Sequence, residues 1–306
     1  MLDLKRALTA SEVEGIIPKE VDKIIQKLVE YNNPLRQNLP RKPGSGSAYY
    51  VNRRTASGTP AVFVNDTEEF TEATGTYTQV SFEYKTIGTQ GKITRKARKI
   101  GANYVDLLAA EMEAKAEEVR DKEDWALLWG DKTADSKQFD GLYKLCDSSN
   151  IFGAGDSAAG GAITAELLDE AIDAVRGNPD MIICSKRTRR RINALLQQFQ
   201  RFVNTVEVKG GFKLLSYNGI PIYISSNVPD TIQVNSDCTA ITGLTGGTLS
   251  ALFIVDTSKV FVAELTPLKV EPLAKSSSQF DAFDIYEDIT LVATDAKAIS
   301  CIIGIQ

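Results

Sequence analysis

The sequence predicts an α+β protein in which a globular part carries long extensions. A helix with an apolar stripe is expected over roughly 102–129, and helices alternate with strands from residue 164 onward. Between residues 61 and 100 the pattern is typical of a long β-ribbon, with too few apolar residues for a central sheet. Because an isolated ribbon is only marginally stable, we expect this one to need a partner surface.

The composition excludes several classes of function. The chain has 306 residues and a net charge of −5, and its 43% hydrophobic and 25% charged residues are ordinary for a soluble protein. It contains no run of about 18 apolar residues and no apolar signal-peptide core. We therefore expect no membrane partner and synthesis in the cytosol, and the negative charge argues against a dedicated DNA-binding protein.

Enzymatic chemistry is not expected either. The chain has no histidine, which is the commonest general base and metal ligand near neutral pH. The four cysteines, Cys146, Cys184, Cys238 and Cys301, are too widely spaced for a zinc or redox motif. Cys184 and Cys301 lie in apolar runs and are expected to be small buried side chains. We expect no catalytic residue, no cofactor and no metal ion.

The first part of the chain is expected to be an arm. Residues 18–31 read as an amphipathic helix, packed either on its own domain or on a neighbour. Residues 34–47 contain three prolines and a Gly/Ser run, so the sequence predicts irregular structure there. Because both the arm and the ribbon are poor in apolar residues, we expect them to lie on neighbouring copies of the chain.

The ribbon is predicted from strands at 61–66 and 76–88, followed by a basic run from Lys85 to Gly101 with six positive charges. This run contains a Gly-Lys pair, but it does not form a phosphate-binding loop. Thr86 stands where that motif needs its first glycine, and Ile93 lacks the required hydroxyl. We expect the run to continue as an extended strand rather than to begin a helix.

The long helix carries its apolar stripe at Val105, Leu108, Met112, Ala116, Val119 and Ala126, and Gly130 is placed to cap its end. Its acidic opposite face is expected to be solvated.

The second half of the chain gives clear local signals. Thr164 and Ser185 are placed to cap two helices that flank a buried strand, 180–185, and Asn218-Gly219 predicts a hairpin. The basic run 186–191 is either a solvated or interface face or a polyanion contact. Asp281, Asp284 and Asp288 are interpreted as an exposed acidic edge rather than as a catalytic or metal cluster.

The order of these elements resembles the major capsid protein of tailed bacteriophages, which has the Hong Kong 97-type fold. In both, a ribbon with an alternating strand is followed by a basic segment, a long spine helix, a helix–strand–helix unit and final strands. The resemblance covers about residues 50–306. The matching positions are Glu123, Asp124, Ala126, Leu128, Gly130, Gly141-Leu142 and Gly219-Ile220-Pro221.

The resemblance implies a division into parts. Residues 1–50 would be the N-terminal arm, 51–100 the extension loop, 101–150 with 260–306 the peripheral domain containing the spine helix, and 151–259 the axial domain. No long amino-terminal scaffolding segment precedes the arm, so a self-fused scaffold is not expected. No lysine occurs from Arg54 to Tyr84, so the covalent crosslinks of the type member are not expected.

The implied function is that of a structural shell subunit. Copies would assemble in the bacterial cytoplasm into hexamers and pentamers of an icosahedral capsid, which matures from a procapsid and encloses double-stranded DNA. The implied partners are further copies of the chain, a separate scaffolding protein, a portal and decoration proteins. Two alternatives stay open: the shell of an encapsulin-type bacterial compartment, and a nucleic-acid-binding protein with a basic arm.

Charge segregation suggests where copies would meet. The basic run should face carboxylates of another copy, with DNA as a secondary partner, because blocks of both signs on one chain suit self-association. The candidate interface residues are Lys92, Arg95, Lys96, Arg98 and Lys99 on the basic side, and Glu68, Glu69, Glu72, Glu117 and Glu118 on the acidic side.

Overall fold

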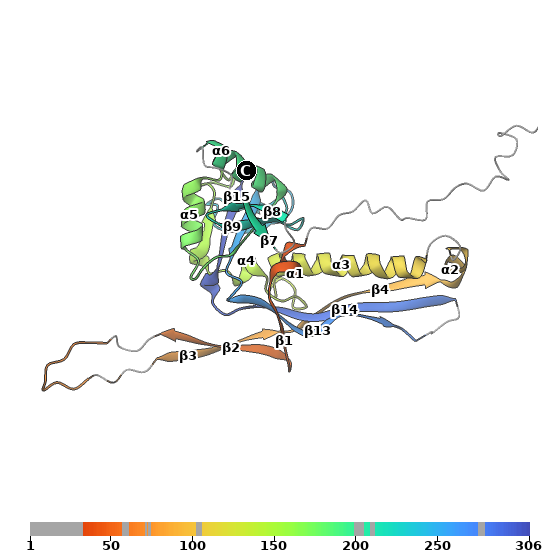
Figure 1. The fold of residues 1–306 in the computed structure, drawn as a ribbon, viewed down its shortest axis with the longest axis horizontal. Coiled ribbons are helices and arrows are strands. Elements are labelled where there is room, and N and C mark those ends of the chain that lie inside the picture. The colour runs from red at the N-terminus through yellow and green to blue at the C-terminus, as the bar shows by residue number, and fades with distance from the viewer. Residues whose placement is uncertain are drawn as a thin grey trace, which may run out of the picture.

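A computed structural model describes residues 33–56, 61–70, 72, 75–101, 106–198, 205–208, 212–274 and 279–306. The helix expected over 18–31 and the stripe residue Val105 lie outside this part of the chain. Figure 1 shows a globular part, a long flat part that extends from it to one side, and a ribbon that projects in the opposite direction.

The flat part is a four-stranded sheet of order β1-β13-β14-β4, in which β1 is parallel to β13 and the other pairs are antiparallel. The long helix α3 lies along this sheet (Figure 1). Its stripe residues Leu108, Met112, Ala116 and Val119 pack against the sheet, which confirms that prediction. The strands are β1 (Arg41–Pro43), β4 (Lys85–Thr94), β13 (Val260–Pro272) and β14 (Phe280–Ala293).

The long helix has the ends that its sequence dictates. Helix α3 (Leu107–Trp129) begins after Asp106, whose carboxylate accepts hydrogen bonds from the amides of Leu108 and Ala109. It ends at Gly130, as predicted. The glycine is required there because a side chain would overlap the backbone of Phe139.

The ribbon consists of β2 (Ala48–Ala56) and β3 (Thr76–Glu83), paired antiparallel. The prediction of a strand at 61–66 is wrong, because β2 is the partner of β3 and the residues at 61–66 join no sheet. The strand expected at 76–88 is divided at Tyr84, since β4 joins β14 instead of continuing the ribbon.

The base of the ribbon packs on its own subunit. Four half-buried side chains from β2, β3 and the junction with β4 contact buried residues of β13 and β14, on the part of the sheet nearest the globular domain. Arg53 donates a hydrogen bond to the carbonyl of Ala293 at 2.5 Å. The prediction that the ribbon lies on a neighbour is therefore wrong for its base. The contacting residues are Tyr49, Val51, Phe82 and Tyr84 against Phe261, Ala263 and Val292.

Two short helices replace segments expected to be extended or irregular. The basic run forms α2 (Arg95–Gly101) directly after β4, because the ladder with β14 ends at Thr94 and the Thr94 hydroxyl then accepts from the Ala97 amide. The proline-rich arm forms α1 (Pro34–Asn38) and β1. Pro34 suits the first turn of a helix, and β1 is an edge strand, where proline is tolerated.

The globular part is built on a seven-stranded sheet of order β5-β15-β12-β6-β9-β8-β7. Helices α5 (Ala165–Asp173) and α6 (Lys186–Gln198) pack on one face of it. The strands are β5 (Ile151–Gly153), β6 (Met181–Cys184), β7 (Thr205–Val208), β8 (Phe212–Tyr217), β9 (Ile220–Ile224), β12 (Ser250–Val255) and β15 (Ile299–Ile305).

The local predictions for this part are confirmed. The hydroxyls of Thr164 and Ser185 accept from the amides of Leu167 and Thr188. Asn218 and Gly219 have φ of 50° and 83°, as a tight hairpin between β8 and β9 requires. The strand β15 lies in this sheet, paired with β12, and not with β13 and β14 as the expected grouping of 260–306 implied.

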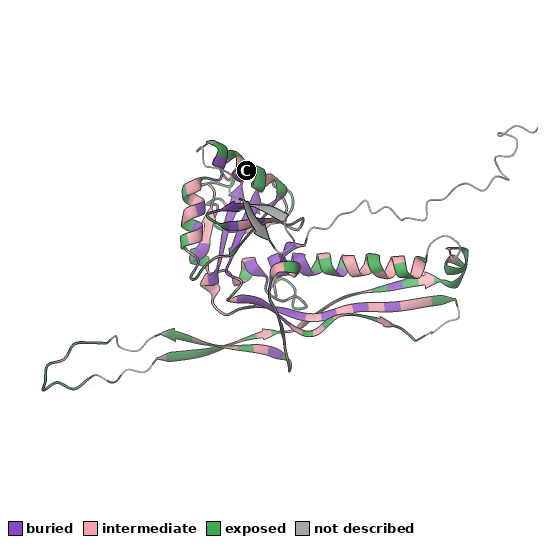
Figure 2. Ribbon diagram, viewed as in Figure 1, coloured by how far each residue is buried: buried purple, intermediate pink, exposed green. Residues whose placement is uncertain are grey.

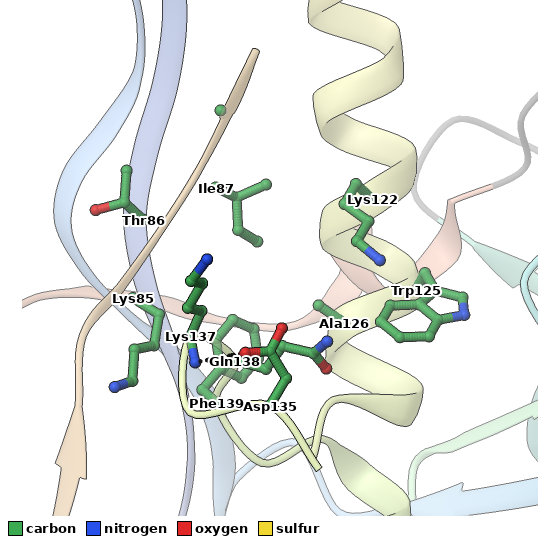
Figure 3. Close-up of a pocket in the computed structure, with 11 residues that line it drawn as sticks. Lys85, Thr86, Ile87, Lys122, Trp125, Ala126, Asp135, Lys137, Gln138 and Phe139 are labelled. Carbon is green, nitrogen blue, oxygen red and sulfur yellow. Dashed lines mark hydrogen bonds between the residues drawn. The ribbon is translucent and has the colours of Figure 1, made fainter. Parts of the chain in front are cut away.

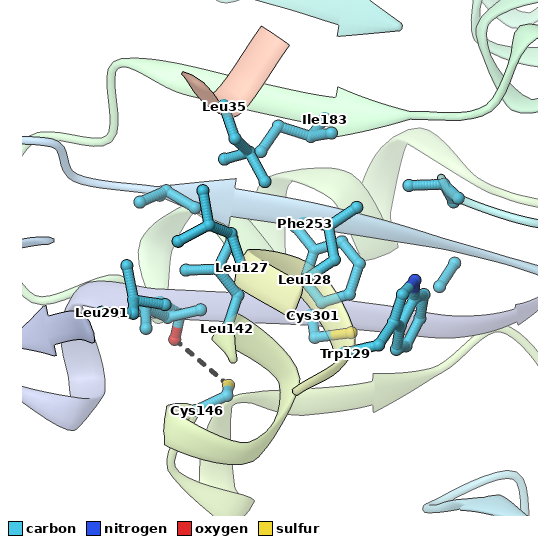
Figure 4. Close-up of a cluster of buried hydrophobic side chains, with 14 of the residues drawn as sticks. Leu35, Leu127, Leu128, Trp129, Leu142, Cys146, Ile183, Phe253, Leu291 and Cys301 are labelled. Carbon is cyan, nitrogen blue, oxygen red and sulfur yellow. Dashed lines mark hydrogen bonds between the residues drawn. The ribbon is translucent and has the colours of Figure 1, made fainter. Parts of the chain in front are cut away.

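The end of the long helix is buried between the two sheets. Figure 2 shows α3 changing from mixed exposure along its length to continuous burial at its end. There, Leu127, Leu128 and Trp129 pack with Leu35 of α1 and Phe253 of β12 (Figure 4). All four cysteines are buried, as expected for Cys184 and Cys301. The smaller elements around this core are α4 (Leu142–Leu145), β10 (Gln233–Val234), β11 (Ile241–Gly243) and the 3-10 turns Ser148–Asn150 and Ala296–Ala298.

Candidate functional site

Five charged residues fix the described part of the arm to its own subunit. The side chains of Glu123 on α3 and Glu287 on β14 are 0% exposed. Arg36 of α1 binds both carboxylates, with its Nη1 3.0 Å from Glu287 Oε2, and Arg41 of β1 binds Glu123 and, at 2.9 Å, Glu264. Burial raises the pKa of Glu287, and the positive charge of Arg36 opposes this rise.

Asp124 makes a second buried contact with the arm. Its carboxylate accepts from the Leu35 amide at 3.1 Å, from the Ser225 hydroxyl at 2.9 Å and from the Asn227 amide group at 3.4 Å. Burial raises the pKa of Asp124 to about 6, and these hydrogen bonds oppose the rise. Residues 34–43 therefore pack on their own body, and the prediction that they lie on a neighbouring copy is wrong.

The acidic face of α3 is solvated only in part. Glu118 is exposed, as expected, and pairs with Lys115 at 2.8 Å within the helix, and Glu117 is half-buried. The prediction is wrong for Glu123 and Asp124, which are 0% exposed. A signal was present in the sequence, because these two acids precede the apolar run 125–129 and a helix that is apolar all round is buried.

The basic candidates gather at the far end of the flat sheet, which we call the basic tip. Lys92 lies near the end of β4 with its Nζ 4.2 Å from the centre of the Phe280 ring, and Arg98 pairs with Asp281 at 3.0 Å. Arg98 therefore has a carboxylate partner within its own chain. Among the described residues, no ion pair involves Arg95, Lys96 or Lys99. Arg95, Lys96, Arg98 and Lys99 line a hollow there with Ile100, Gln279 and Asp281.

The acidic candidates Glu68, Glu69 and Glu72 lie beyond the ribbon strands, among the described residues 61–70 and 72, which we call the acidic tip. Two large apolar side chains in the acidic tip are open to solvent: Phe63 is 106% exposed and Phe70 76%. Figure 1 places the acidic tip and the basic tip at opposite ends of the molecule. The structure therefore does not bring the two sets together within one chain, and their pairing between copies stays a prediction.

A cavity of about 340 Å³ lies between β4, the second half of α3 and the loop 131–140 (Figure 3). Lys85, Lys122, Lys137 and Asp135 line it, and Lys122 Nζ lies 3.5 Å from the centre of the Trp125 ring. Burial lowers the pKa of Lys122.

The remaining candidate residues lie in the paired strands β4 and β14. Gly91 and Lys92 lie within the ladder of β4 and β14, so no loop curls around a phosphate, and a side chain at Gly91 would overlap the ring of Phe283. Asp284 and Asp288 accept hydrogen bonds from Gln90 and Thr86 across the strands. In the described ranges no cluster of three metal-ligating side chains is found. None of the helices in that part of the chain is long and apolar enough to cross a bilayer.

A comparison of the sequence with protein families identifies the family of this two-sheet protein. The model of the SU10 major capsid protein family matches residues 19–306. The chain belongs to the SU10 major capsid protein family. It is therefore a capsid shell subunit of the virion, and its role is structural. No curated protein sequence matches the chain.

Solved structures show the same fold at low sequence identity. The cyanophage A-1(L) capsid protein matches with a TM-score of 0.72 and 13% identity, over 97% of this chain and 99% of that one. The match to Mycobacterium phage Bobi has a TM-score of 0.68 and 15% identity, over 97% and 99%. The SrpI encapsulin of Synechococcus elongatus PCC 7942 matches with a TM-score of 0.73 and 12% identity, over 98% and 97%. The predicted capsid fold is confirmed.

Proposed function

We propose that copies of this capsid protein assemble in the host cytoplasm into hexamers and pentamers of an icosahedral shell around double-stranded DNA. One observation carries the proposal: the acidic tip and the basic tip lie at opposite ends of one elongated molecule (Figure 1). Two different surfaces that complement each other form a head-to-tail contact, and such contacts close into rings or continue into extended assemblies.

The energetics favour a repeated contact over a single strong one. An exposed ion pair contributes only about 0–1 kcal/mol, so one tip-to-tip contact would be weak. Phe63 and Phe70 add apolar area that a neighbour would cover. A shell repeats the contact at every subunit, and the weakness of each contact lets misplaced copies dissociate before the shell closes.

The parts of the subunit would have different roles, because some of them pack on its body and others project from it. Residues 34–43 and the ribbon base are fixed to the body, so the acidic tip would be the part of the extension loop that reaches a neighbour. The seven-stranded sheet, including β15, would form the axial domain, and the four-stranded sheet with α3 the peripheral domain. A scaffolding protein, a portal and decoration proteins would be the further partners.

Charge reversal tests the tip-to-tip contact. The variant Arg95→Glu/Lys99→Glu turns two cations of the basic tip into acids. Neither cation has an ion pair among the described residues, so the free subunit should keep its stability. The variant should nevertheless fail to assemble at moderate salt. Adding Glu69→Lys/Glu72→Lys should restore particles, seen by electron microscopy. Lys137→Glu, away from both tips, is the control. Normal assembly of the first variant would refute the contact.

The same preparations distinguish the alternatives. A phage shell isolated from infected cells should hold double-stranded DNA, whereas an encapsulin-type compartment should hold a packaged protein. A nucleic-acid-binding protein would show strong, salt-dependent DNA affinity as an isolated subunit. Failure of the wild-type protein to form any closed particle would refute the proposed shell.

A further inference from the structure

Helices α5 and α6 present exposed charges of opposite sign on the same layer of the globular domain. Both helices pack on one face of the seven-stranded sheet. In Figure 1, α5 runs along the flank of this domain and α6 lies across its upper end. The two charged surfaces therefore belong to different sides of one rigid unit.

The acidic surface is a narrow stripe on α5. Glu166, Glu170 and Asp173 are exposed and follow one another at spacings of four and three, so they lie on one helix face. The buried residues Leu168 and Ala171 lie on the opposite face, so this stripe points away from the core. The other acid of the helix, Asp169, is used internally, since it accepts from the Tyr217 hydroxyl at 2.8 Å.

The basic surface lies on the first half of α6. Lys186, Arg189, Arg190 and Arg191 are all exposed, while Ile192 and Leu196, which pack on the sheet, are buried. Arg187, in contrast, interacts within its own subunit. It donates a hydrogen bond to the carbonyl of Thr248 at 2.8 Å and lies 3.4 Å from Asp230.

Within the described residues, both surfaces keep their charge. Over the part of the chain that the structure describes, no ion pair joins any of the outward-facing charges of α5 or α6. At 1.5 Å per residue, Glu166 to Asp173 spans about 10 Å and Lys186 to Arg191 about 8 Å. The two surfaces thus match in length as well as in sign.

We propose that the α5 stripe of one copy binds the basic face of α6 on the next copy, in a head-to-tail contact between globular domains. A contact of two different surfaces repeats in one direction and closes into a ring, as a capsid hexamer or pentamer requires. The inference rests on the proposed shell, and it adds a second interface that does not involve the ribbon or the basic tip.

The acidic helix is the observation that favours a protein partner over DNA. A DNA duplex lying along this layer would meet the carboxylates of α5 as well as the cations of α6, and like charges repel. A second copy of the chain offers both signs at once, so each surface finds its complement.

Charge exchange between the two helices tests the contact. Arg190→Glu/Arg191→Glu should raise the protein concentration needed for assembly at least tenfold, and Glu166→Lys/Glu170→Lys should do the same. The combined variant has the net charge of the wild type and should assemble near the wild-type concentration. A charge-matched comparison sets Arg190→Ala/Arg191→Ala against Ala194→Glu/Gln197→Glu, at two exposed positions on the second half of α6. Both pairs shift the charge by −2, and only the first should raise the concentration needed for assembly.

A chemical crosslink provides an independent readout on the wild-type protein. Lys186 carries the only amine on α6, so a zero-length carbodiimide crosslinker should join it to Glu166, Glu170 or Asp173. Mixing isotope-labelled and unlabelled subunits before assembly shows by mass spectrometry whether the crosslinked peptides come from different copies. Assembled particles should give mixed pairs, and free subunits should not.

The outcomes separate this inference from the proposed shell. Unchanged assembly of both reversal pairs, or no rescue in the combined variant, would overturn the α5–α6 contact while leaving the shell intact. Reversal on α6 that spares assembly but lowers the DNA content of the particles would assign α6 to nucleic acid and would also overturn it. A wild-type protein that never forms closed particles would refute the shell itself.

Discussion

Replacing Arg36 with leucine should destabilise the free subunit much more than replacing Arg98 with leucine. Both arginines hold a carboxylate with a nitrogen–oxygen distance of 3.0 Å, so distance alone predicts equal effects. Their surroundings differ. The side chain of Arg36 is 19% exposed and that of Glu287 is 0%, whereas Arg98 is 53% exposed and Asp281 17%.

Burial decides the size of each effect. Removing one partner of a buried ion pair leaves an uncompensated charge and costs about 3–5 kcal/mol. Without Arg36, Arg41 would be the one described cation paired with this group of acids, Glu123, Glu264 and Glu287. An exposed pair contributes about 0–1 kcal/mol. The two variants should therefore differ by about 3 kcal/mol in the free energy of unfolding.

The defect should also depend on pH. Burial already raises the pKa of Glu287, and loss of Arg36 removes the charge that opposes this rise. When the pKa in the folded state lies above that in the unfolded state, protonation favours folding. The Arg36→Leu defect should therefore shrink as the pH falls from neutral toward the pKa of the buried glutamate.

Urea unfolding of assembly-blocked subunits, followed by tryptophan fluorescence, measures these differences at neutral and mildly acidic pH. The slope of the unfolding free energy against urea must match between variants, so that midpoints report stability. Two results would refute the role assigned to the buried charges. One is a loss of unfolding free energy that agrees within about 1 kcal/mol between Arg36→Leu and Arg98→Leu. The other is a loss in Arg36→Leu that grows on acidification.

Three further predictions follow from other sites. Asp124→Asn should gain about 3 kcal/mol of stability relative to the wild type as the pH rises from about 4 to about 7. The reason is that the pKa of Asp124 is about 6 in the folded state against an ordinary value of 3.8, so the wild type loses stability as this buried group ionises. A difference in urea midpoints that stays constant with pH would contradict this. Gly91→Ala should destabilise the sheet by about 1–3 kcal/mol, because the added carbon overlaps the ring of Phe283, and an unchanged melting temperature would show that the ring can move. Mature particles should give one band near 33.4 kDa on denaturing gels, because residues 54–84 contain no lysine, and a ladder of covalent multimers would refute this.

Predictions that depended on local signals were confirmed. The capping hydroxyls of Thr164 and Ser185 and the Asn218-Gly219 turn act within a few residues of the chain, so their effect can be derived without knowing the fold. The apolar stripe of α3 is also a local pattern, and it fixed which helix face meets the sheet.

Predictions that depended on distant partners failed. The Arg41–Pro43 segment is a strand because β13, more than 200 residues later, offers it an edge. The basic run becomes helical at Arg95 because the pairing of β4 with β14 ends at Thr94. Two arginines of the arm pair with Glu123, and no helical periodicity predicts a partner 82 residues away. The pairing of the candidate interface residues depends on other copies of the chain and stays a prediction.

The four-stranded sheet has a consequence for synthesis of the chain on the ribosome. Arg36 and its partner Glu287 are separated by 251 residues, and both β1 and β4 pair with strands that are translated much later, β13 and β14. At about 5–20 residues per second, the arm waits on the order of 10–50 s for its partner. A nascent subunit therefore cannot complete the sheet that holds its basic tip until β14 has been made. A chain that stops before β14 would lack the basic tip and could not make the tip-to-tip contact.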